Sequence, residues 1–211
     1  MPRGGLSFSR KATMKPTGFY KLSPEYLALV RRLGGTYRDN KSRPVYCCIQ
    51  DRDNPGIYWA IPTSDIAHRT SEQIDRIKRY CSFEDRDIRS CYYHIGHTNR
   101  PAIFKISNVL PVTEKHIDGE YISQGSHLVL RDKKLIAEIE RKLSRILFDE
   151  SRHPNKYEQR ISSIYDFLAD EIARTGAVCD EKLSVRDLLN SATQGTQGRS
   201  IFPKQKDDHE R

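Results

Sequence analysis

The chain has 211 residues, of which 36 are Lys or Arg and 28 are Asp or Glu, so its formal charge is +8. With 36% hydrophobic and 30% charged residues, it has enough apolar residues for one lean core beneath a highly charged surface. No stretch approaches the roughly 18 uninterrupted apolar residues of a membrane span. The basic first residues also lack the apolar run of a secretory signal, so we expect a soluble, cytoplasmic protein.

The positive charge is concentrated in the first half of the chain. Residues 1–105 carry 19 basic and 10 acidic side chains, whereas residues 106–211 carry 17 and 18. Such an excess favours binding of a polyanion, above all a nucleic acid, although a solubilising surface is the alternative. Charge alone does not distinguish RNA from DNA.

The first predicted elements are a short strand and a helix. Residues 1–17 contain no acid and are interpreted as a disordered basic arm, and residues 18–22 predict a strand. Ser23 is a typical N-cap, and Gly34 is a typical residue to end the helix that follows. Tyr26 lies on the apolar face of this helix, together with Leu29, Val30 and Leu33.

Short strands continue to about residue 113. Residues 44–62 predict a hairpin, a helix capped by Thr70 or Ser71 follows, and the segments SCYYHI and PAIFKISNVLPV add further strands. The second half is helical instead, because apolar residues recur at helical spacing over 133–150 and 156–174.

We therefore predict an α+β fold, a compact twisted antiparallel sheet or partial barrel with helices packed against it. The expected organisation is the arm at 1–17, one domain at 18–175, and a short helix with a flexible tail at 176–211.

The usual motifs of metal and cofactor sites are absent. The sequence has no phosphate-binding glycine loop, no zinc-binding pair of C-x-x-C elements and no disulfide framework among its five cysteines. Cys91, His94 and His97 are the nearest approach to a metal cluster, but strand alternation places the first two on opposite faces. We expect no metal and no cofactor.

The segment IPTSDIAHRT holds the densest group of polar residues with catalytic potential. Thr63, Ser64, His68 and Arg69 follow a predicted strand directly, in a connection to the next helix. Histidine suits proton transfer near neutral pH, while hydroxyls and arginine bind phosphate oxygens, so this set fits metal-free cleavage of an RNA phosphodiester. Alternatively, Thr63 and Ser64 cap the next helix.

A family resemblance adds to this interpretation. The order FYKLSPEYL, TYRDNKSRPVYCCI, YWAIPTSDIAHR and FKISNVLPV resembles the endoribonuclease toxins of type III toxin–antitoxin systems, the ToxN/AbiQ group with its CptN-like and TenpN-like relatives. The resemblance spans about 18–168. It implies a twisted antiparallel sheet of the PemK/MazF type, RNA cleavage, inhibition by a repeated RNA pseudoknot, and abortive infection against phage.

The resemblance also implies roles for individual residues. Thr63 and Ser64 match the family's pair at the scissile phosphate, Tyr26 and Tyr37 match tyrosines that position RNA, and Arg43 replaces a lysine. The ToxN branch has a lysine two residues after the serine, where this chain has Ile66, so His68 becomes the candidate for proton transfer. Lys41 and Arg69 are further expected RNA contacts.

The leading hypothesis is thus a metal-independent, sequence-preferring endoribonuclease toxin that leaves 2′,3′-cyclic phosphate and 5′-hydroxyl ends. Its expected partners are substrate RNA and an RNA antitoxin, with which it can form a hetero-oligomer; no membrane is involved. Two alternatives remain open. One is a non-catalytic nucleic-acid-binding protein of a mobile element, and the other is a type II PemK/MazF-like toxin with a protein antitoxin.

Overall fold

The protein is described by a computed structural model that covers residues 14–37 and 43–175. Chain contacts divide it into two units, Met1–Asp170 and Glu171–Arg211. The expected arm up to residue 13, Lys41, and the predicted short helix and tail at 176–211 lie outside the described residues. No helix of the described part is both long enough and apolar enough to cross a membrane.

The elements alternate short strands with helices. The strands are β1 Gly18–Leu22, β2 Val45–Gln50, β3 Tyr58–Asp65, β4 Tyr93–His97, β5 Pro101–Lys105, β6 Leu110–Val112, β7 Ile117–Glu120, β8 Ile122–Ser123 and β9 Ser126–His127. The α-helices are α1 Pro24–Arg32, α2 Ser71–Cys81 and α3 Lys133–Arg152, and residues 161–175 are also helical. Short 3-10 helices are η1 Ile66–His68, η2 Ile88–Cys91, η3 Ile106–Asn108 and η4 Glu114–His116.

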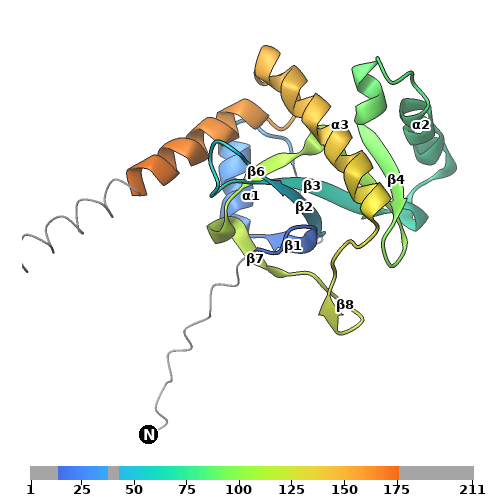
Figure 1. Ribbon diagram of the computed structural model, residues 1–211, viewed down its shortest axis with the longest axis horizontal. Helices are drawn as coiled ribbons and strands as arrows, with labels where there is room; N and C mark the ends of the chain where they lie inside the picture. Colours follow the sequence, from blue (N-terminus) through green and yellow to red (C-terminus); the bar gives the residue numbers. More distant parts are fainter. Residues whose placement is uncertain (1–13, 38–42, 176–211) are drawn as a thin grey trace, which may run out of the picture. The chain divides into compact units, whose positions relative to one another are not determined.

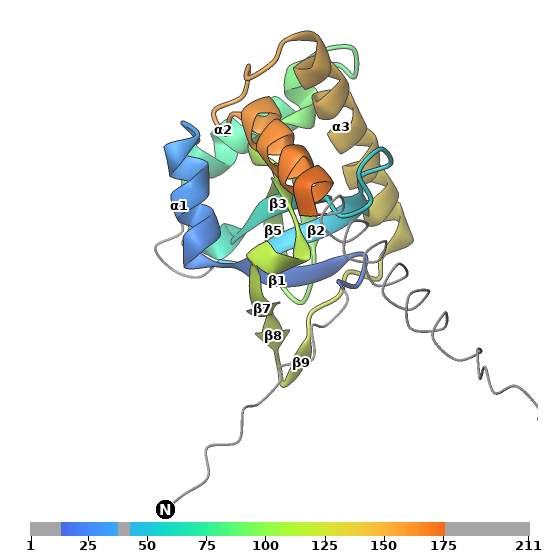
Figure 2. The same ribbon diagram turned by 90° about the vertical axis from the view of Figure 1, so that its left-hand side faces the viewer.

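One antiparallel sheet organises these elements. Its strands run in the order β4-β5-β3-β2-β1-β7, while β6 pairs with β3 and the β8–β9 hairpin forms a separate pair. Figure 2 shows β7 beside β1 at one end of the sheet, with β8 and β9 beyond it. The α+β prediction is confirmed, and the sheet remains open within the described residues rather than closing into a barrel.

Strand β3 connects the two parts of the sheet. Its first half pairs with β2 and with β6, and its last three residues, 63–65, pair with β5. The chain turns through η3 between β5 and β6, so both strands align along the same β3 edge. The polar residues at the end of β3 therefore lie where its partner on this edge changes from β6 to β5.

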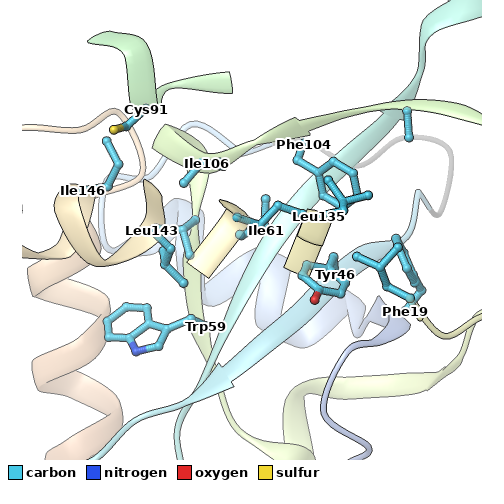
Figure 3. Close-up of a cluster of buried hydrophobic side chains, with 14 of the residues drawn as sticks. Phe19, Tyr46, Trp59, Ile61, Cys91, Phe104, Ile106, Leu135, Leu143 and Ile146 are labelled. Atoms are coloured by element: carbon cyan, nitrogen blue, oxygen red, sulfur yellow. The ribbon is translucent and has the colours of Figure 1, made fainter. Parts of the chain in front are cut away.

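The core lies between this sheet and α3. Figure 3 shows Phe19, Tyr46 and Phe104 from the strands facing Leu135 and Leu143 from the helix, and all five are buried. Helix α3 also packs against η2 and η3, while α2 packs against η2 and β4 (Figure 1). The apolar residues whose spacing predicted α3 thus lie on the face of the helix that packs against the core.

The caps of the first two helices agree with their sequence signals. The Ser23 hydroxyl accepts a hydrogen bond from the Tyr26 amide, and Gly34 has the positive φ of 89° that favours glycine after a helix. Thr70 caps α2, with Gln73 completing a capping box.

Three expectations need correction. The last helix begins at 161 rather than 156, because Arg160 has a left-handed φ of 56°. Residues 117–127, in which no strand was predicted, form β7, β8 and β9. Finally, the last residues of the expected arm contact the domain at two points: Met14 is buried, and the Thr17 amide donates to the Cys47 carbonyl.

Candidate functional site

A cleft of about 650 Å³ opens at the end of β3. The end of β3, η1 and the following residue form one wall, and the segment before β2 adjoins it. The turn between β4 and β5 forms another wall, and residues near the β8–β9 hairpin complete the lining. The lining residues are Phe19, Arg43, Pro44, Thr63, Ser64, Asp65, His68, Arg69, Thr98, Asn99, Arg100, Pro101, Ala102, Tyr121, Ser123 and Leu128.

Two caps shape the wall that carries His68. The Asp65 carboxylate accepts a 2.8 Å hydrogen bond from the Ala67 amide and caps η1, and Thr70 caps α2. His68 and Arg69 lie between these caps, with His68 exposed and Arg69 half-buried. The alternative that Thr63 and Ser64 cap the next helix is therefore wrong.

Thr63 holds the neighbouring segment in place. Its side chain is buried, its hydroxyl donates to the Pro44 carbonyl at 2.8 Å, and its amide reaches the same oxygen at 3.3 Å. Pro44 follows Arg43, so these bonds fix the backbone next to the Arg43 side chain. The donor of the Thr63 hydroxyl is therefore occupied by a backbone carbonyl in this structure.

Ser64 differs from Thr63 in its hydrogen bonding. Its hydroxyl oxygen is buried and has no hydrogen-bond partner among the described residues. An unpaired buried hydroxyl costs about 1–3 kcal/mol, and a phosphate oxygen bound in the cleft would satisfy it. Ser64 is therefore the hydroxyl of this wall that has no hydrogen-bond partner among the described residues.

The two other walls are joined by a polar contact. The Asn99 amide donates to the Ser123 hydroxyl at 2.6 Å, which links the β4–β5 turn to β8. In the same turn, Arg100 forms a 3.8 Å ion pair with Asp65. These residues come from two hairpins remote in sequence, and no local motif marks them.

A second, smaller hollow of about 250 Å³ adjoins the cleft. Arg43 and Thr63 line both spaces, so the two meet at these residues. The smaller hollow is lined by Thr36, Tyr37, Arg43, Pro62, Thr63, Lys105, Asn108, Glu158 and Gln159.

Lys105 is the member of this hollow that sequence reasoning missed. It ends β5, is half-buried, and forms no ion pair with any carboxylate of the described residues. Burial, followed by the charges of Arg69 and Arg43, lowers the pKa of its ammonium group to about 8. The available signal was a lysine directly after three consecutive apolar residues of a predicted strand.

The structure gathers most of the predicted site residues but not all of them. Arg43, Thr63, Ser64, His68 and Arg69 line the cleft, and Tyr37 lines the smaller hollow. Lys41 lies outside the described residues.

Tyr26 is the exception. It is fully buried, its hydroxyl donates to the Pro111 carbonyl, and its ring centroid lies 4.7 Å from that of His116. Burial also raises the pKa of this phenol well above its usual range. Tyr26 is thus a core residue here, and an RNA contact by its side chain is not supported.

The candidate metal cluster does not assemble. Cys91 is buried in the core, and residues 14–37 and 43–175 contain no group of three or more His, Cys, Asp or Glu side chains placed to hold a metal ion.

No family model and no curated protein matches this chain. Among solved structures it is similar to AbiQ, described as a lactococcal anti-phage endoribonuclease belonging to the type-III toxin-antitoxin system. The two share 14% identity with a TM-score of 0.49, over 69% of this chain and 88% of the other. A likeness at this level assigns neither a site nor an activity.

Proposed function

We propose that this protein is a metal-independent, sequence-preferring endoribonuclease that acts as the toxin of a type III toxin–antitoxin system. The observation that carries the proposal is the convergence at one cleft of Arg43 and Arg69 with the Ser64 hydroxyl and the His68 imidazole. Cations and a hydroxyl bind a phosphate, and an imidazole transfers protons at neutral pH, so together they meet the needs of phosphodiester cleavage.

The charge of the surrounding chain supports a polyanionic substrate. The excess of positive charge lies within residues 1–105, and the cationic residues lining the cleft belong to that half. A basic cleft raises the local concentration of nucleic acid and contributes binding that weakens as salt increases. RNA is favoured over DNA because its 2′-hydroxyl can act as an internal nucleophile, and the His68 imidazole of the cleft can accept the proton.

In the proposed reaction the 2′-oxygen attacks the adjacent phosphorus while His68 accepts its proton. Arg43, Arg69 and the Ser64 hydroxyl stabilise the charge on the phosphorane, and Thr63 keeps the Arg43 segment in position. The bond from phosphorus to the 5′-oxygen then breaks and that oxygen takes up a proton. The products are a 2′,3′-cyclic phosphate and a 5′-hydroxyl.

The biological setting follows the family resemblance of the sequence. An RNA antitoxin of repeated pseudoknots would occupy the same basic cleft, block the substrate and form a hetero-oligomer with the protein in the cytoplasm. Release of the toxin would produce abortive infection against phage.

The decisive experiment is incubation of purified full-length protein with RNA in excess EDTA, with the termini of the products identified by mass spectrometry. We expect cleavage with cyclic phosphate ends, and strong loss of cleavage in Ser64→Ala and His68→Ala. Ser144→Ala and His153→Ala are matched controls, because both residues are exposed on or beside α3 and outside the cleft. RNA left intact by the wild-type protein would refute the proposal, and salt-sensitive binding without cleavage would indicate a nucleic-acid-binding protein instead.

A further inference from the structure

The two adjoining hollows divide the candidate site into two halves. Arg43 and Thr63 line both of them, Ser64 and His68 line only the larger, and Tyr37 and Lys105 line only the smaller. A phosphodiester held at the shared boundary would have one nucleotide on each side. The proton acceptor proposed above lies on one side of this boundary, and an amine lies on the other.

Building on the RNA cleavage proposed above, we propose that the smaller hollow receives the nucleotide on the 3′ side of the cleaved bond and that Lys105 protonates its leaving 5′-oxygen. Lys105 would then be the general acid of the reaction, and Tyr37 would contact the leaving nucleotide. The larger cleft would hold the nucleotide that supplies the 2′-hydroxyl.

The position of Lys105 suits a proton donor to a phosphate ester. It is the last residue of β5, and its neighbour Phe104 pairs with Thr63 of β3, so it lies one residue along the sheet from the shared boundary. The amine has no carboxylate partner among the described residues, and two guanidinium groups act on it electrostatically. A bound phosphate would place negative charge beside these three cationic groups.

Several segments around the hollow and around Lys105 present ionisable groups. Arg43 precedes β2, Arg69 follows η1, Tyr93 of β4 is the cross-strand partner of Lys105, and Glu158 follows α3. Tyr93 is kept neutral, because burial raises the pKa of its phenol.

Burial and the two arginines lower the pKa of Lys105 to about 8. At that value the amine is still largely protonated at pH 7, and it releases its proton more readily than an ordinary lysine. Because the acid form is the active one, cleavage should decline as the pH rises through about 8.

The step balances in atoms and charge. The bond from the 2′-oxygen to phosphorus forms as the bond from phosphorus to the 5′-oxygen breaks. His68 gains the proton of the 2′-hydroxyl, and Lys105 loses one to the 5′-oxygen. The enzyme is left with an imidazolium and a neutral amine, and proton exchange with water restores both.

The test compares two synthetic RNAs built around one linkage that the wild-type protein cleaves. One carries the natural 5′-oxygen at that linkage and the other a bridging 5′-sulfur, which leaves as a thiolate without needing protonation. We expect Lys105→Ala to lose about 100-fold or more of the cleavage rate on the oxygen substrate. On the sulfur substrate it should cleave at nearly the wild-type rate.

Lys105→Arg separates proton transfer from charge. Arginine keeps the positive charge but does not release its proton, so this variant should resemble Lys105→Ala on both substrates. Lys134→Ala, which removes an exposed lysine of α3 outside both hollows, should behave as wild type. The wild-type protein provides a measurement without substitution: its decline above about pH 8 should disappear on the sulfur substrate.

Three results would overturn the assignment: full activity of Lys105→Arg on the oxygen substrate, failure of the sulfur substrate to rescue a folded Lys105→Ala, or the same alkaline decline on both substrates. Each of these leaves the endoribonuclease proposal intact, because the wild-type protein still cleaves RNA. Absence of cleavage by the wild-type protein would refute both proposals.

Discussion

Thr63→Val tests whether Thr63 positions Arg43 or touches the phosphate itself. The substitution replaces the hydroxyl by a methyl group of similar size. It removes the 2.8 Å bond to the Pro44 carbonyl, but the carbonyl keeps the 3.3 Å bond from the Thr63 amide. No buried group is orphaned, so the expected loss of unfolding free energy is about 1 kcal/mol, or about 2–4 °C in Tm.

The size of the catalytic effect distinguishes the two roles. If the whole 1 kcal/mol acted on the placement of Arg43, cleavage would fall by about fivefold. Loss of a direct hydrogen bond to the phosphorane would reduce it by about 10²–10³-fold. We expect the smaller effect, measured as single-turnover cleavage with protein in excess, and Thr63→Ser should remain close to wild type because it keeps the donor. A decrease of 100-fold or more with an unchanged Tm would refute the positioning role.

Three further substitutions test the structure around the site. Tyr26→Phe should lower the free energy of unfolding, measured in urea, by about 1–3 kcal/mol because the Pro111 carbonyl loses the hydrogen bond from the phenol. RNA binding should stay unchanged. Weaker RNA binding by a folded variant would show that Tyr26 does contact RNA. Lys142→Met removes a buried ammonium that donates to the Ser90 and Tyr93 carbonyls at 3.0 and 3.1 Å, and we expect a lower Tm because both carbonyls lose this donor. An unchanged or higher Tm would show that burying the charge costs at least as much free energy as its hydrogen bonds contribute. Burial opposes ionisation of Asp149, but hydrogen bonds from Lys156 and Tyr157 outweigh it and lower the pKa of the carboxyl. The ionised Asp149 carboxylate therefore stabilises the folded protein above the ordinary pKa of 3.8, and this stabilisation is lost as the pH falls below that value. Asp149→Asn should accordingly make Tm fall less steeply at acid pH, and an unaltered acid limb of the Tm–pH curve would contradict this.

Elements with local signals were predictable from the sequence. Ser23 and Thr70 cap their helices through side chains three residues or fewer from the amides they satisfy, so the sequence contains the whole interaction. Helix α3 was equally predictable, since its buried residues recur at helical spacing.

The start of the last helix was not predictable in the same way. Tyr157 continues the apolar spacing, yet its hydroxyl donates to Asp149 at 2.8 Å and the chain there is irregular. The helix begins after Arg160, where the Ser162 amide donates to the buried Glu150 of α3 at 3.0 Å. A cap supplied by another element leaves no trace in the local sequence.

Tyr26 shows how an apolar pattern can outweigh a motif. Its position on the apolar face with Leu29 and Val30 predicted burial, whereas the family resemblance implied an RNA contact. The structure buries all three side chains, and a buried tyrosine places its hydroxyl on a nearby backbone carbonyl. Helical position was the better guide to this side chain.

The candidate site likewise contains residues that local sequence reveals and one residue that only the three-dimensional fold brings to the site. Thr63, Ser64, His68 and Arg69 are nearly contiguous, so one segment marked them. The structure adds that the Thr63 hydroxyl is hydrogen-bonded, whereas the Ser64 hydroxyl has no partner among the described residues. Lys105 lies about 40 residues later in an otherwise apolar strand, and only the pairing of β5 with β3 brings it to the boundary that Arg43 and Thr63 share. Where the ToxN branch that the sequence resembles has a lysine two residues after the serine, this chain has Ile66, and the amine near the cleft comes from a different strand of the sheet. A sequence search confined to the motif would therefore find the half of the site that we propose binds the phosphate, and would miss the residue that we propose completes the reaction.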